Sequence, residues 1–110
     1  MILYKFIRNL VDIIRRLECG FDVSEAELWQ LVHSSDYKVR LRAITLGDLT
    51  SEMLDILAND FDSDVRFHVT HNSKTSDETL TELLGDPNII IRAEASNSLF
   101  VRNHVAGGRQ

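Results

Sequence analysis

A pattern of residues recurs three times in this chain, at a constant spacing of 26 residues. Its copies begin at Ser24, Thr50 and Ser76. The other matching positions are Leu28, Leu54 and Leu80; Leu31, Leu57 and Leu83; Asp36, Asp62 and Asn88; Val39, Val65 and Ile91; Arg40, Arg66 and Arg92; and Ala43, Val69 and Ala95. Such a period is typical of a solenoid, in which each unit buries its apolar face only by stacking on its neighbours.

Each copy is predicted to form two short helices. Thr50 is a natural N-cap, because its hydroxyl can accept a hydrogen bond from a free amide of the first helical turn. Leu54 and Leu57 follow as an apolar stripe at helical spacing. Asp62 then caps a second helix with an inward-facing apolar pair four residues apart. The predicted fold is therefore all-α, a short α-solenoid of two-helix repeats.

At 110 residues the chain is expected to form one domain. Its predicted parts are an N-terminal capping helix (1–20), three repeats (24–49, 50–75 and 76–101), and a partial cap with a frayed tail (102–110). Gly20 is expected to end the first helix in a left-handed conformation. The first helix has one broad apolar face. Alternatives to capping are attachment to an anionic membrane surface, docking to a partner, or a homodimer contact.

One arginine of each copy lies next to a predicted core position. These are Arg40, Arg66 and Arg92. Each comes four residues after a predicted cap residue, which is Asp36, Asp62 or Asn88. Guanidinium groups in that setting usually bind carboxylates or carbonyls of the adjacent turn. We interpret the six residues as a structural ladder and not as a row of ligand-binding arginines.

Charge and cysteine content exclude several classes of function. The formal net charge is −5, and residues 22–94 carry fifteen acidic and six basic side chains, which disfavours binding to phosphate backbones. A single cysteine, Cys19, excludes a disulfide framework and a cysteine-rich metal site. Charged residues interrupt the apolar N-terminus, so neither a signal peptide nor a membrane span is predicted. We expect a cytoplasmic protein.

His68 and His71 are three residues apart, and Asp64 precedes them by one turn, as in a partial metal site. However, Arg42 and Glu94 occupy the position of His68 in the other copies. A position that accepts such different charges is typical of solvated surface, so neither a metal nor another cofactor is expected.

The same positions define a predicted binding strip, because the second helices of solenoids usually line the concave face. The strip comprises Leu41, Arg42, Thr45, Phe67, His68, His71, Glu94 and Asn97. Phe67 is its expected anchor. The chain has no nucleophile elbow, phosphate-binding glycine loop, zinc-protease helix or paired-cysteine motif. An enzyme is therefore not expected.

The middle copy resembles the variant leucine-rich repeat, a bacterial HEAT-like helical repeat with the pattern Leu-x-x-Leu-Ala-x-Asp-x-Asp-x-x-Val-Arg-x-x-Val-Ala-x-Asn. The matching residues are Leu54, Leu57, Ala58, Asp60, Asp62, Val65, Arg66, Val69 and Asn72. With partial matches in the flanking copies, the resemblance covers about three quarters of the chain. It implies a superhelix of short helices with interaction surfaces and no common activity.

Two functions follow as hypotheses. The first is a non-catalytic module that binds another protein, of unknown identity, through the concave strip. The second is nucleic-acid binding by arginines of that face, namely Arg40, Arg42, Arg66 and Arg92. A gel shift that depends steeply on salt would distinguish them.

Overall fold

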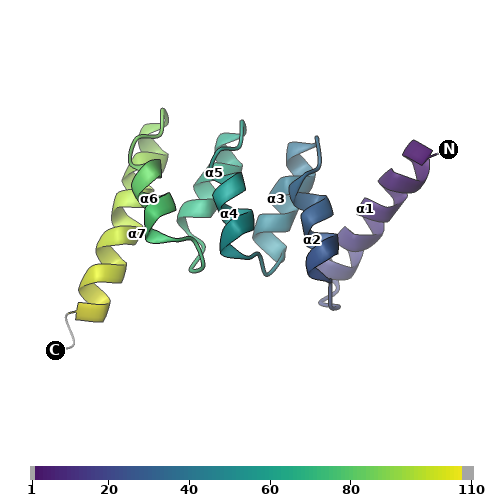
Figure 1. The fold of residues 1–110 in the computed structure, drawn as a ribbon, viewed down its shortest axis with the longest axis horizontal. Coiled ribbons are helices and arrows are strands. Elements are labelled where there is room, and N and C mark those ends of the chain that lie inside the picture. Colours follow the sequence, from purple (N-terminus) through teal and green to yellow (C-terminus); the bar gives the residue numbers. More distant parts are fainter. Residues whose placement is uncertain (1, 108–110) are drawn as a thin grey trace. The chain divides into compact units, whose positions relative to one another are not determined.

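The computed structural model describes residues 2–107, and the side chains of residues 8–104 within that range. These residues form seven helices and no strand, which confirms the predicted all-α class (Figure 1). The helices are α1 (Ile2–Glu18), α2 (Glu25–Val32), α3 (Tyr37–Leu46), α4 (Ser51–Leu57), α5 (Ser63–Thr70), α6 (Asp77–Leu83) and α7 (Ile89–Gly107). None of the helices in this described range is long and apolar enough to cross a membrane.

The chain divides into two compact units, Met1–Leu49 and Thr50–Gln110, which we call unit 1 and unit 2 and describe separately. The boundary lies between the first two predicted repeats. The assignment of the whole chain to one domain stays a prediction.

Unit 1 consists of α1, α2 and α3, and α3 packs against both other helices. Its interior includes Leu10 and Ile13 of α1, Leu28 and Leu31 of α2, and Ala43 of α3. Gly20 has φ +79°, and the amide of Phe21 donates to the carbonyl of Arg16 at 2.9 Å. This bond closes the C-terminus of α1, and it confirms the predicted left-handed glycine.

Unit 2 consists of α4 to α7, with α5 and α6 both packed against α7. The leucines and β-branched residues of the repeated pattern form its core. Buried there are Met53, Leu54, Leu57, Val65, Val69, Leu80, Leu83, Ile91 and Ala95. Full burial of one such aliphatic side chain contributes about 1.5–3 kcal/mol, which makes these positions the main source of stability.

α7 extends beyond the third predicted repeat. It runs without a break from Ile89 to Gly107, across the predicted boundary at 101/102. The reason is local, because Asn-Ser-Lys-Thr-Ser at residues 72–76 supplies a turn and a cap, whereas Ser-Leu-Phe-Val-Arg at 98–102 supplies neither. Met1, residues 108–110 of the predicted tail, and the side chains of residues 2–7 on the predicted apolar face lie outside the described residues.

Candidate functional site

The three ladder arginines bind in one geometry. Each donates from Nη1 to the backbone carbonyl six residues earlier, which lies in the turn before its helix. The donor–acceptor distances are 2.9 Å for Arg40 to Ser34, 2.7 Å for Arg66 to Asp60, and 2.7 Å for Arg92 to Asp86. The arginine thereby fixes the turn that joins the two helices of each predicted copy.

The residues four positions before these arginines, namely Asp36, Asp62 and Asn88, cap the second helix of each copy. Oδ1 of Asp36 accepts a hydrogen bond from the amide of Lys38 at 2.9 Å. Oδ1 of Asp62 accepts from the amides of Asp64 at 3.0 Å and Val65 at 3.1 Å. Oδ1 of Asn88 accepts from the amide of Ile90 at 2.8 Å. Each bond satisfies an amide that the helix itself leaves without an acceptor. These side chains therefore have a local structural role.

In unit 2 the ladder also joins the two helix pairs. Nε of Arg66 donates to Oδ2 of Asp86 at 2.8 Å, and the two side chains are 14% and 3% exposed. Burial is the largest influence on the pKa of Asp86 and would raise it. The opposing hydrogen bonds from Arg66 and from the amide of Asn88, with the charges of Arg66 and Arg92, together lower that pKa below its ordinary value. Asp86 is therefore held as a carboxylate.

Five predicted strip residues lie in unit 2, on α5, at its C-cap (His71) or on α7, and three of them form an aromatic cluster. The ring centroid of the half-buried Phe67 lies 5.6 Å from that of His68 and 4.7 Å from that of His71. A ring nitrogen of His68 lies 2.8 Å from the carbonyl oxygen of Asp64. Phe67 is thus in contact with both imidazole rings and still partly exposed to solvent, as expected of an aromatic contact residue.

The other two residues continue this surface onto α7. Nε2 of His71 lies 3.1 Å from Oε2 of Glu94. His71 and Asn97 also line a hollow of about 270 Å³. Its remaining lining residues are Thr70, Asn72, Ser73, Ser98, Val101 and Arg102. Phe67, His68, His71, Glu94 and Asn97 therefore lie together, and we call them the α5–α7 surface.

The remaining three strip residues lie on α3 of unit 1. Leu41 is half-buried, and Arg42 forms an ion pair with Glu18 of α1. Oγ1 of Thr45 donates to the carbonyl of Leu41 at 2.8 Å, so this hydroxyl is occupied by its own helix. Arg42 also borders a hollow of about 250 Å³ between α1 and α3.

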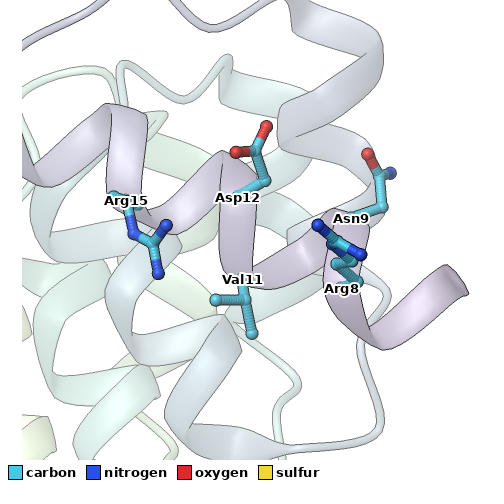
Figure 2. A pocket seen from close by; sticks show the side chains of 5 residues that line it. All are labelled: Arg8, Asn9, Val11, Asp12 and Arg15. Atoms are coloured by element: carbon cyan, nitrogen blue, oxygen red, sulfur yellow. The ribbon is translucent and has the colours of Figure 1, made fainter. Parts of the chain in front are cut away.

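A third hollow, of about 510 Å³, lies along α1 and is lined by Arg8, Asn9, Val11, Asp12 and Arg15 (Figure 2). All five side chains come from one helix, and Figure 2 shows them directed to several sides of it. The surface mixes both charges with Val11, which is 47% exposed.

Within the part of the chain that the structure describes, no three histidine, cysteine or acidic residues are arranged to hold a metal ion. The structure also reveals exposed apolar residues that sequence reasoning missed. Phe61, in the turn between α4 and α5, is 102% exposed, and Ile89 and Phe100 of α7 are 69% and 58% exposed. The only available signal was an apolar residue at a turn position where the other copies have Ser35 and Pro87.

No protein-family model matches this chain, and neither a curated protein nor a solved structure is significantly similar to it.

Proposed function

We propose that the chain is a non-catalytic protein-binding module, built as a short α-solenoid with a 26-residue period and an N-terminal capping helix. In this proposal the module belongs with HEAT-like repeats of the variant leucine-rich type and acts in the cytoplasm. Support comes from the three helix pairs, in which matching residues make matching cap and arginine contacts. In a repeat architecture, local contacts recur with the same period as the buried apolar residues, and the cap and arginine contacts of this chain do so.

The observation that carries the binding function is the α5–α7 surface. It combines a half-buried aromatic ring, the His71–Glu94 pair and the exposed amide of Asn97 beside a hollow. Protein interfaces are centred on aromatic side chains and surrounded by polar groups that can exchange water for partner contacts. The surface therefore has the composition expected of a contact site for another protein.

The nucleic-acid hypothesis has less support. Arg40, Arg66 and Arg92 each donate to backbone carbonyls, and Arg42 is paired with Glu18. Binding phosphate would break these bonds. Unit 2 carries ten acidic and five basic side chains, a formal net charge of −5, which opposes contact with a polyanion.

Cross-linking and capture from the source cells would test the proposal. We expect the wild-type chain to retain a defined protein, and the variants Phe67→Ala, His71→Ala and Asn97→Ala to lose most of it. Truncation of a contact residue at an interface centre costs about 1–2 kcal/mol or more, a tenfold or greater loss of affinity. His33→Ala and Asn59→Ala are matched controls, since both side chains are exposed elsewhere. Equal capture by all five variants would refute a binding role for the α5–α7 surface.

A further inference from the structure

Arg66 shows how a ladder arginine of this chain uses two sides of its guanidinium. Its Nη1 donates to the carbonyls of Asp60 at 2.7 Å and Phe61 at 3.1 Å, in the turn before its own helix. Its Nε donates to Oδ2 of Asp86 at 2.8 Å and its Nη2 to Oδ1 at 3.3 Å, in the turn before α7. Because Nε and Nη2 donate to the same side of the planar group, they form a fork that fits a carboxylate. We call this side the Nε–Nη2 edge.

Arg92 of α7 repeats the first half of this arrangement. Its Nη1 donates to the carbonyls of Asp86 at 2.7 Å and Pro87 at 3.3 Å, which lie six and five residues earlier, as they do for Arg66. Among the described residues, however, none accepts a hydrogen bond from the Nε–Nη2 edge of Arg92. The Asp86 carboxylate is near enough to interact electrostatically with Arg92, but its oxygens accept from Arg66 and from the amide of Asn88.

The side of the helix that carries this edge is covered on α5 and open on α7. Thr70, one turn after Arg66, is 1% exposed, because the helix pair that carries Asp86 packs on this side of α5. Ser96, at the matching position one turn after Arg92, is exposed. A ligand can therefore reach Arg92 along the side from which Asp86 reaches Arg66.

We propose that the Nε–Nη2 edge of Arg92 binds the carboxylate of an aspartate in a turn of a partner protein, in the way that Arg66 binds Asp86. Each carboxylate oxygen accepts one hydrogen bond, from Nε or from Nη2. The bonds from Nη1 to the turn before α7 stay in place, so binding breaks no contact of the folded chain. The proposal is independent of the α5–α7 surface, because none of the five residues of that surface takes part.

A carboxylate fits this edge better than a phosphate group does. The pair within unit 2 shows that the fork takes a carboxylate in this setting. A phosphate would bring additional negative charge next to the Asp86 carboxylate, in a unit whose formal net charge is already −5. A polypeptide can offset the repulsion of its own carboxylate by apolar contact. Ile89, three residues before Arg92 and thus on the same side of α7, is 69% exposed and available for it.

Nuclear magnetic resonance of the isotope-labelled, full-length wild-type chain would test this proposal. The probe is the peptide acetyl-Leu-Gly-Asp-Pro-Asn-Ile-amide, which copies residues 84–89 and carries the carboxylate of Asp86. Titrated to about 10 mM, it should move the Nε–H resonance of Arg92 towards that of Arg66, whose Nε–H already binds a carboxylate. The resonance of Arg66 should not move. The same peptide with Asp86→Asn should bind at least about fivefold more weakly, because hydrogen bonds to a charged acceptor are stronger than those to a neutral one.

Two variants separate binding by the fork from general attraction to a positive charge. Arg92→Lys keeps the charge and can still donate to the preceding turn, but it lacks the planar fork. The shifts that the peptide causes at the backbone amides of Ala93 and Ser96 should therefore fall about fivefold or more. Arg8→Gln removes an exposed arginine of α1 and should bind the peptide as the wild type does. A folded Arg92→Lys chain with undiminished shifts would overturn the proposal.

The wild-type titration remains decisive even if Arg92→Lys does not fold. An Arg92 resonance that does not move, or one that moves equally with the aspartate and asparagine peptides, contradicts the proposal. Acetate and inorganic phosphate at the same concentrations distinguish the sources of the anion, and both should cause smaller shifts than the aspartate peptide. An equal or larger shift with acetate would assign the edge to small free carboxylates, and one with phosphate to phosphate-bearing ligands. Either result would refute binding of a partner's aspartate.

Discussion

Asp86 connects several parts of unit 2 through its carboxylate and its backbone carbonyl. Its Oδ2 accepts from Nε of Arg66, its Oδ1 accepts from the amide of Asn88, and its backbone carbonyl accepts from Arg92. One residue thereby joins α5 to the turn before α7 and fixes that turn internally. Arginine suits this site because its planar fork can serve both a carboxylate and a carbonyl, which a lysine ammonium cannot do in fixed geometry.

We predict that Asp86→Ala lowers the free energy of unfolding by about 3 kcal/mol, because it leaves a nearly buried guanidinium without its counter-charge. Urea unfolding followed by circular dichroism would measure this loss. Asp77→Ala is the matched control. Asp77 pairs with Arg102 at 3.0 Å but its side chain is 65% exposed, so its loss should cost less than about 1 kcal/mol. Equal urea midpoints for Asp86→Ala and the wild type would contradict the assigned role.

At the residue scale, the sequence predicts a contact correctly where both of its partners lie in the same short segment. The caps Thr50 and Asp62 were predictable, because a cap binds amides two or three residues ahead in the same segment. The Arg66–Asp86 bond spans twenty residues, and its formation depends on how two helix pairs pack.

At the scale of the helix, the N-terminal cap of α2 is formed by neighbouring residues and is also bound by a residue of another helix. Ser24 and Glu27 form a capping box at its N-terminus, and Arg16 of α1 also binds the Glu27 carboxylate. The hydrogen bond from Arg16 is the main cause that lowers the pKa of Glu27 from 4.5 to about 2, and the Ser24 amide adds to it. The same bond raises the pKa of Arg16.

This shift predicts how the stability of unit 1 depends on pH. Because the pKa of Glu27 is lower in the folded state, its contribution is complete above 4.5 and is lost as the pH falls towards 2. Glu27→Gln should therefore lower the melting temperature at neutral pH, and the difference from the wild type should shrink across that window. Glu25→Gln, an exposed change in the same first turn, should have little effect at any pH. A Glu27→Gln difference that stays constant down to pH 2 would exclude this linkage.

In α7 the 26-residue period no longer predicts where a helix ends. Arg102 occupies the position at which a fourth copy would begin, but it lies inside the helix. There it donates to the carbonyls of Thr75 at 2.6 Å and Asn72 at 3.1 Å. The extended helix is thereby fastened to the loop between α5 and α6. The missing cap residues at 98–102 are visible in the sequence, whereas this contact depends on the packed structure.

At the scale of the whole molecule, the two units differ in charge. Unit 1 carries seven acidic and seven basic side chains, whereas the net charge of unit 2 is −5. Unit 2 also contains specific bonds between its helix pairs, among them Arg66–Asp86 and Ser98–Thr70. The period predicted the helix pairs and their buried residues. It could not predict this division, because matching residues recur on both sides of the boundary.

The bonding within unit 2 leads to a prediction about its independence. We expect the fragment Thr50–Gln110 to fold alone, with helical circular dichroism and a cooperative melting transition, because its core and its bonds between helix pairs are contained within it. With only 61 residues it should be marginal, with a stability of about 3–5 kcal/mol or less.

The decisive comparison is with residues 50–85, which retain α4, α5 and α6 but lack Asp86 and α7. Both α5 and α6 bury apolar side chains against α7, so this shorter fragment should lose its cooperative transition and most of its helical signal. Equal transitions in the two fragments would show that each helix pair is stable by itself. Neighbouring pairs would then not be needed to bury the repeated apolar face, and the physical basis for assigning a repeat architecture to this chain would be lost.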